Sequence, residues 1–229
     1  METIDRQLAA LIDHTLLKPD ATAAEIEALC REARDYGFGA VCVNGFWAPR
    51  CRELLQGSGV KLCCVVGFPL GAMTAAAKAF EAQQAVAAGA DELDMVINLG
   101  ALKSGDEAEV EQDIRGVVAA AGGRPVKVIL ETGLLTDAEK VLACRLSQRA
   151  GAAFVKTATG FAAGSAATRE DVALMRRTVE PAMGVKASGG IRTREDARRM
   201  LASGATRLGT RSGIAIVTGS RDGIAGIRG

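Results

Sequence analysis

The sequence predicts an α/β fold, a (β/α)8 TIM barrel with a short N-terminal helix. Short runs rich in Val, Ile and Leu alternate with longer segments of helical period, which is the pattern of a parallel sheet. Eight such units can be counted, and no Pro/Ser-rich linker divides the 229 residues. We therefore expect one barrel domain over residues 1–229. An open doubly wound sheet is the main alternative, because periodicity does not distinguish a closed sheet from an open one.

The expected elements follow one another in order along the chain. An opening helix over about 3–10 precedes strands at 11–15, 40–44, 61–67, 92–98, 126–131, 153–157, 184–188 and 206–209. Helices are expected to begin at Thr22, near Pro49, and at Thr74, Asp106, Thr136, Thr168, Thr193 and Ser212. Thr22 with Glu25, and Thr136 with Glu139, have the spacing of capping boxes.

Composition excludes several classes of protein. The chain is 48% apolar and 24% charged, which is the balance of a protein able to bury a large core. A net charge of +1 and 3% aromatic residues argue against nucleic acid or membrane as partners. The N-terminus has no signal-peptide pattern, so we expect a cytoplasmic location. Six cysteines without a CxxC pair indicate reduced thiols, and a single histidine argues against zinc, so no metal and no cofactor are expected.

Charged residues at the ends of four predicted strands are the candidates for chemistry, because barrel active sites lie at the C-terminal ends of strands. These residues are Asp13, Asp94, Lys156 and Lys186. Lys156 stands in a run otherwise suited to a buried strand. Burial and a second cation, Lys186, would lower the pKa of its ammonium group and yield a neutral amine that attacks a carbonyl. A lysine that reaches from a strand end to water is the alternative, but two lysines on neighbouring strands favour function.

The two acidic candidates have different interpretations. Period-two alternation puts Asp94, Val96 and Asn98 on one face of their strand, so Asp94 would point toward the lysines if that face is the interior. There it could relay protons or form an ion pair with Lys186, and the two roles are compatible. Asp13 could contact a substrate hydroxyl or cap the following turn, and both roles remain open.

Two glycine-containing loops indicate a phosphate site. They are Ser188-Gly189-Gly190 after the seventh strand and Gly209-Thr210-Arg211-Ser212 after the eighth, where barrels commonly bind phosphate. Ordinary tight turns are the alternative. Cys42 could line the pocket or belong to the core, His14 is expected to be a packed residue, and Glu131 could be a hydrogen-bonding partner within the barrel.

Several long motifs resemble those of the deoxyribose-phosphate aldolases, which are class I Schiff-base enzymes. They are Ile12-Asp13-His14-Thr15-Leu16-Leu17-Lys18, Val66-Gly67-Phe68-Pro69-Leu70-Gly71, Glu92-Leu93-Asp94-Met95-Val96-Ile97-Asn98, Phe154-Val155-Lys156-Thr157-Ala158-Thr159-Gly160 and Val185-Lys186-Ala187-Ser188-Gly189-Gly190-Ile191. The resemblance implies reversible cleavage of 2-deoxy-D-ribose 5-phosphate to acetaldehyde and D-glyceraldehyde 3-phosphate, without a metal.

By position, this resemblance implies roles for individual residues. Lys156 would form the Schiff base, Lys186 would lower its pKa, and Asp94 would relay protons. The substrate-binding positions would be Asp13, Cys42, Thr157, Gly189, Gly190, Gly209, Arg211 and Ser212.

The sequence departs from the family pattern at a few positions. Ala158 replaces an expected serine, and Arg211 stands where a small hydroxyl residue is commoner. Some relatives end in a tyrosine that assists proton transfer, whereas this sequence ends at Arg228-Gly229, so we expect Asp94 and water to suffice. The alternatives are a Schiff-base aldolase for another sugar phosphate and a catalytically silent sugar-phosphate-binding barrel. A homo-oligomer, with a dimer as first choice, is also expected.

Overall fold

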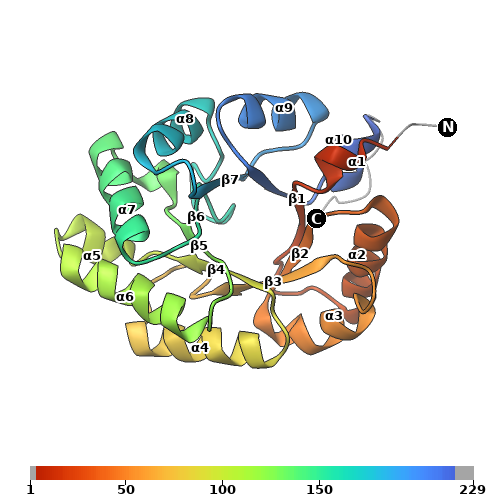
Figure 1. The fold of residues 1–229 in the computed structure, drawn as a ribbon, viewed down its shortest axis with the longest axis horizontal. Coiled ribbons are helices and arrows are strands. Elements are labelled where there is room, and N and C mark those ends of the chain that lie inside the picture. Colours follow the sequence, from red (N-terminus) through yellow and green to blue (C-terminus); the bar gives the residue numbers. More distant parts are fainter. Residues whose placement is uncertain (1–3, 220–229) are drawn as a thin grey trace.

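The strands close into a barrel, as the sequence predicts. The computed structural model describes residues 4–219, and its strands pair in parallel in chain order, with the last one returning to the first. Figure 1 shows these strands within a ring of helices. This closed order excludes the open doubly wound sheet. Within the described residues the strands are β1 (Ile12–Leu16), β2 (Ala40–Val43), β3 (Lys61–Val66), β4 (Glu92–Val96), β5 (Val126–Ile129), β6 (Phe154–Lys156), β7 (Gly184–Ser188) and β8 (Arg207–Thr210).

Helices cover the outside of the barrel (Figure 1). Over residues 4–219 they are α1 (Arg6–Ala9), α2 (Ala23–Tyr36), α3 (Ala48–Leu54), α4 (Ala75–Ala87), α5 (Leu99–Lys103), α6 (Glu107–Ala120), α7 (Asp137–Arg149), α8 (Arg169–Thr178), α9 (Arg194–Ala202) and α10 (Gly213–Thr218), with short 3-10 helices η1 (Gly45–Trp47) and η2 (Thr132–Leu134). None of these described helices has the length and apolar character needed to cross a membrane.

Side-chain caps define where many of the helices begin. The hydroxyls of Thr22 and Thr136 accept hydrogen bonds from the backbone amides three residues later, and Glu25 and Glu139 return bonds to the caps. Both predicted capping boxes are therefore confirmed. A third, unpredicted box joins Thr193 to Asp196, which takes the place that glutamate or glutamine usually occupies.

Several predicted boundaries differ from the observed ones at the ends of strands. The strand predicted to end at residue 98 ends at Val96, because the side chain of Asn98 caps the unpredicted helix α5 by accepting a hydrogen bond from the amide of Ala101. The opening helix is also shorter than predicted, at Arg6–Ala9, and residue 3 lies outside the described range. The order of the elements is unaffected by these differences.

The barrel wall separates two environments. Outward side chains such as Val41, Met95 and Val155 are fully buried against the helices in one large apolar core. Inside the barrel a small apolar cluster lies beside charged groups, which also contact one another from strands that are not neighbours, as Lys186 on β7 does with Asp94 on β4. Barrel interiors are usually filled with branched apolar residues, and buried charges are costly unless paired. The ionic interior therefore marks the part of the molecule where function is concentrated.

Candidate active site

Three buried lysines converge on one carboxylate inside the barrel. Asp94 extends from β4, and Lys127, Lys156 and Lys186 extend from β5, β6 and β7. The Nζ atoms of Lys156 and Lys186 lie 2.8 and 2.7 Å from Asp94 Oδ2, whereas Lys127 Nζ lies 2.8 Å from Asp94 Oδ1. The structure thus brings together the three residues to which the sequence assigns catalysis. It adds Lys127, which sequence reasoning missed.

Two further carboxylates and a guanidinium extend the network toward the N-terminal ends of the strands. Arg207 Nη1 lies 2.7 Å from Asp13 Oδ1, and Arg207 Nη2 lies 3.2 Å from Glu92 Oε1. Lys127 Nζ is 2.7 Å from Glu92 Oε2, and Lys186 donates to Asp13 Oδ2. The carboxylate of Asp13 is therefore held by cations inside the barrel, and among the described contacts it does not cap the following turn.

These ion pairs keep the three carboxyl groups ionised despite their burial. Burial by itself would raise the pKa of Asp94, but the three lysines together hold it well below its usual value. For Asp13, the neighbouring cations outweigh burial and lower the pKa to about 2. The pKa of Glu92 is likewise lowered, mainly by Lys127, against the effect of burial. All three groups are carboxylates at neutral pH.

The pKa values of the cations also reflect a balance between burial and neighbouring charges, but here burial lowers the pKa and the neighbours raise it. Burial lowers the pKa of Lys127 and of Lys186, but the surrounding carboxylates outweigh it, so both values are raised above that of an ordinary lysine. The pKa of Arg207 is raised by Asp13 and Glu92 in the same way, against the effect of burial. These three groups therefore remain positively charged at neutral pH.

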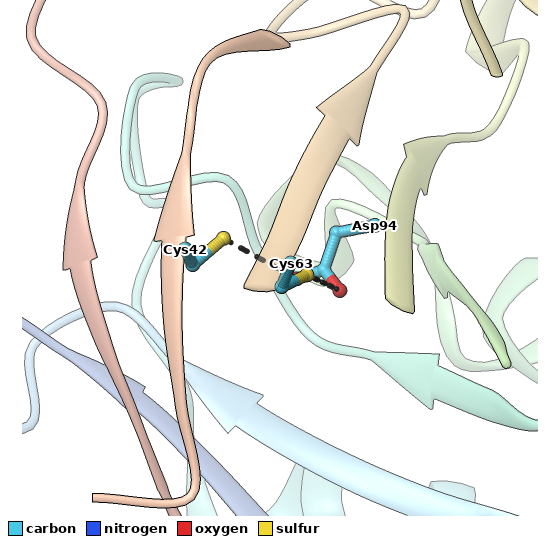
Figure 2. Close-up of side chains that lie close together, drawn as sticks. All are labelled: Cys42, Cys63 and Asp94. Atoms are coloured by element: carbon cyan, nitrogen blue, oxygen red, sulfur yellow. Dashed lines mark hydrogen bonds between the residues drawn. The ribbon is translucent and has the colours of Figure 1, made fainter. Parts of the chain in front are cut away.

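Two thiols form the wall of the site beside Asp94. Cys42 and Cys63 are register partners on β2 and β3, and Figure 2 shows both close to this carboxylate. Cys63 Sγ donates to Asp94 Oδ1 at 3.0 Å, and Cys42 Sγ lies 4.0 Å from Oδ2. The sulfurs and a carboxylate oxygen lie within 4.8 Å of one another, a spacing that suits a soft metal ion. However, ammonium groups already bind both oxygens and would repel a cation, so we assign the thiols to the wall.

The loop after β7 has the backbone conformation for which the sequence selects glycine. Gly189 and Gly190 both have positive φ, at 92° and 76°. A Cβ atom at Gly189 would lie 2.5 Å from the carbonyl oxygen of Ser165, so glycine also allows the loop after β6 to approach. The phosphate-binding role of these two glycines stays a prediction.

The loop after β8 includes the other predicted phosphate-binding residues. A Cβ atom at Gly209 would lie 3.0 Å from Lys186 Cε, so this glycine leaves room for a lysine of the network. Arg211 is exposed, and Ser212 lies at the N-terminus of α10, where its amide donates to Thr210 Oγ1 at 2.9 Å. An exposed arginine in this loop is free to meet an anion from solvent.

The segment after β6 is tied to the strands on both sides. Thr157 Oγ1 donates to the carbonyl of Ser188 at 2.9 Å and accepts from its amide at 2.9 Å, so this predicted substrate-binding side chain links β6 to β7. Glu131, which has a φ of 56°, accepts hydrogen bonds from Thr159 Oγ1 and, at 2.5 Å, from Ser165 Oγ. The carboxylate thereby holds the loop that follows Lys156.

Among the weaker candidates, His14 points to the outside of the barrel. Its Nε2 lies 2.7 Å from Glu32 Oε2, and its ring centroid is 4.7 Å from that of Phe38. These contacts are those of a packed residue, as expected. The chain end at Arg228-Gly229, on which the expectation about proton transfer depends, lies outside the described residues.

Sequence reasoning missed Lys127, Glu92 and Arg207, although one signal was present. Lys127 stands in Val126-Lys127-Val128-Ile129, a run as apolar as the one around Lys156. Glu92 and Arg207 are the first residues of β4 and β8, whereas the predicted site depends on charged residues toward the C-terminal ends of strands. A charged residue anywhere on the inward face of a buried strand would have been the better criterion.

A closed barrel with an ionised cluster of lysines and carboxylates in its interior defines an enzyme of the α/β-barrel class. Residues 7–219 match the model of the DeoC/LacD aldolases. The chain belongs to the DeoC/LacD family of aldolases.

Individual relatives resemble this chain over nearly its whole length. Deoxyribose-phosphate aldolase 1 of Bacillus licheniformis is 59% identical over 215 residues, which are 93% of this chain and 96% of that protein. The Brevibacillus brevis deoxyribose-phosphate aldolase is 60% identical over 210 residues, or 92% and 95% of the two chains. Among solved structures, deoxyribose phosphate aldolase from Aeropyrum pernix superposes with a TM-score of 0.86 at 40% identity, covering 94% of this chain and 91% of that one.

Proposed function

We propose that this chain catalyses the reversible cleavage of 2-deoxy-D-ribose 5-phosphate to acetaldehyde and D-glyceraldehyde 3-phosphate. The names of relatives about 59% identical to it support this substrate. The observation that carries the proposal is the pair of lysine nitrogens, Lys156 and Lys186, that share one oxygen of Asp94 inside a barrel. Schiff-base catalysis needs one amine that loses its proton beside a group that keeps its charge.

Lys156 is the lysine best placed to meet a substrate. It is the last residue of β6, at the end of the barrel where substrates bind, and it is 3% exposed whereas Lys127 and Lys186 are fully buried. Lys186, whose pKa is raised by Asp13 and Asp94 against the effect of burial, keeps its positive charge. These differences support Lys156 as the nucleophile and Lys186 as its charged neighbour.

The reaction on Lys156 can be written with its protons balanced. The neutral amine adds to the C1 aldehyde of the open-chain sugar, and the resulting carbinolamine takes up one proton at its hydroxyl and loses water to form an iminium ion. Loss of the proton from the C3 hydroxyl breaks the C2–C3 bond and releases D-glyceraldehyde 3-phosphate, which leaves an enamine on the lysine. Protonation at C2 and addition of water then release acetaldehyde and restore the amine.

Asp94 is placed to move protons in these steps. Its Oδ2 already accepts from Lys156 at 2.8 Å, so it can take a proton from the amine directly and exchange it with the carbinolamine through water. Because its pKa is held well below the usual value, Asp94 carries a proton only transiently and returns it to the reacting groups. This behaviour suits a relay rather than a store of protons.

The phosphate group of the substrate is assigned to the loops after β7 and β8. The exposed guanidinium of Arg211 and the glycine amides of Gly189 and Gly190 support this assignment, because positive φ at both glycines allows a close approach of the backbone to an anion. Asp13 and Cys42, both fully buried, would contact only the part of the substrate that enters deepest.

Trapping with borohydride tests the proposed function. Incubation with acetaldehyde and sodium borohydride should attach an ethyl group to Lys156, located by peptide mapping, and a Lys103→Met control on α5 should label equally. Acetaldehyde should also be released from 2-deoxyribose 5-phosphate and not from fructose 6-phosphate. Labelling elsewhere or not at all, in a folded protein, would instead support a silent sugar-phosphate-binding barrel.

Self-association and a cytoplasmic location complete the proposal. Large apolar side chains, Phe46, Leu70 and Phe80, are 82%, 71% and 62% exposed, which supports contact with a second copy of the chain. Light scattering at several concentrations would report the mass, with a dimer expected. All six cysteines are free thiols, which supports a reducing compartment.

A further inference from the structure

The proposed chemistry leaves Lys127 without a task. Its side chain is fully buried, and its Nζ lies 2.8 Å from Asp94 Oδ1 and 2.7 Å from Glu92 Oε2. Burying an ion pair is expensive, and an apolar residue of similar volume is often at least as stabilising. A third lysine in this position therefore points to a purpose beyond stability.

The two oxygens of Asp94 are divided between two sets of donors. Oδ1 accepts from Lys127 at 2.8 Å and from Cys63 at 3.0 Å, whereas Oδ2 accepts from Lys156 at 2.8 Å and Lys186 at 2.7 Å. A carboxylate offers about four lone-pair sites. Lys127 therefore anchors the oxygen that faces away from the reacting amine and turns the other oxygen toward it.

The charges of the network balance only when Lys127 is counted. Apart from Lys156, the ion pairs inside the described barrel join equal numbers of cations and anions, namely Lys127, Lys186 and Arg207 with Asp13, Glu92 and Asp94. Their formal charges sum to zero. An uncharged amine at Lys156 therefore leaves this network neutral, and removal of Lys127 would leave it with one excess negative charge.

Other ionisable groups near the network do not alter this balance. Cys42 and Cys63 share one hydrogen bond between β2 and β3, which lowers the pKa of Cys42, whereas burial and this bond raise the pKa of Cys63 well above its usual value. Lys61 reaches Glu92 at 3.1 Å, but its side chain is 52% exposed and screened by water. The carboxylate of Glu131 faces the loop after β6, where two hydroxyl groups bind it.

We propose that Lys127 is a positioning residue that supplies the counter-charge allowing Lys156 to remain a neutral amine, while it orients Asp94 through Oδ1. Without the charge of Lys127, the excess negative charge of the remaining network favours a proton on Lys156. A protonated amine cannot attack the substrate. This inference rests on the proposed Schiff-base function and assigns a cause to the ionisation state that the reaction requires.

Three variants test the charge balance, because it predicts the direction in which each one moves the pH profile of activity. The rate of acetaldehyde release is measured against pH, and Lys127→Met should move the acidic limb of the profile to higher pH by about one unit or more. Glu92→Gln, which removes a negative charge, should move the limb to lower pH. The double variant Lys127→Met/Glu92→Gln is neutral again and should return the limb toward its original position.

The outcomes separate a positioning role from a purely structural one. Loss of stability alone, with an unmoved acidic limb in folded Lys127→Met, would overturn the inference. If Lys127→Met does not fold, Glu92→Gln and the double variant still decide it, because a limb that stays in place or moves upward in Glu92→Gln contradicts the balance. Borohydride labelling of Lys156 in the unsubstituted protein checks the proposed function separately, so the two failures are distinguishable.

Discussion

Replacement of Lys186 by methionine removes the fixed charge beside the reacting amine. Because Lys156 and Lys186 are both hydrogen-bonded to Asp94 Oδ2, at 2.8 and 2.7 Å, their nitrogens lie no more than about 5.5 Å apart. Two positive charges at this distance repel by about 3 kcal/mol at an effective dielectric constant of about 20. Since about 1.4 kcal/mol corresponds to a factor of ten, kcat/KM should fall by roughly 100-fold in Lys186→Met at neutral pH.

The assay is kcat/KM for cleavage of 2-deoxyribose 5-phosphate across the pH range. The variant should lose activity most strongly at neutral pH and recover part of it in alkaline solution, where an amine nucleophile depends less on a charged neighbour. A folded Lys186→Met protein with an unchanged rate and an unchanged profile would refute the electrostatic reasoning.

A buried lysine outside the barrel provides the matched control. Lys78 on α4 is also fully buried, and it donates to Asp113 Oδ2 at 2.5 Å and to the carbonyl of Val96 at 2.9 Å. Removing one partner of a buried ion pair lowers the free energy of unfolding by about 3–5 kcal/mol. Lys78→Met should therefore lower the free energy of unfolding, as Lys186→Met does, but leave the pH profile in place. Chemical denaturation of both variants separates the two effects.

Three other predictions follow from the site and its surroundings. Lys156→Ala should abolish turnover and borohydride labelling, while circular dichroism shows an intact fold; residual turnover on the same substrate would contradict the assignment. Arg211→Ser should raise KM by about 2- to 5-fold, the effect of an exposed ion pair of up to about 1 kcal/mol, whereas Arg198→Ser on the outer helix α9 should leave KM unchanged. Because Asp13 has a folded pKa of about 2, below an unfolded value of about 3.9, the stability that it contributes is present above pH 4 and lost as pH falls toward 2, by about 2 kcal/mol. Urea titrations at several pH values should show this loss, and Asp13→Asn should flatten it.

The fold was predictable because each βα unit carries its own local signals. The two capping boxes, at Thr22 with Glu25 and at Thr136 with Glu139, depend only on residues three apart, and both are present. Strand ends were less predictable. Asn98 continues the alternation of β4, but its side chain caps α5. The first amides of a helix lack backbone partners, so Asn98 ends the strand and accepts a hydrogen bond from the amide of Ala101.

The candidate site was only partly predictable, for a reason that lies in the geometry of the barrel. Lys156 is the last residue of β6, whereas Asp94 and Lys186 are the middle residues of β4 and β7, so a rule about strand ends describes only one of the three. Lys127 and Arg207 are the register partners of Asp94 and Lys186, and their importance depends on which carboxylates of other strands they contact. Sequence separations of 33 residues between Asp94 and Lys127, and of 194 between Asp13 and Arg207, leave no local trace of these contacts.

By itself, the sequence determined the number and order of the βα units, the residues that share a face of each strand, and the presence of lysines in apolar runs. Only the tertiary structure decided that the sheet closes, and with it which face is interior, which oxygen of Asp94 each lysine meets and how the charges balance. The physical reason is that side-chain direction in a strand follows from the local backbone. A buried charge is instead tolerated or rejected by partners that arrive from distant parts of the chain.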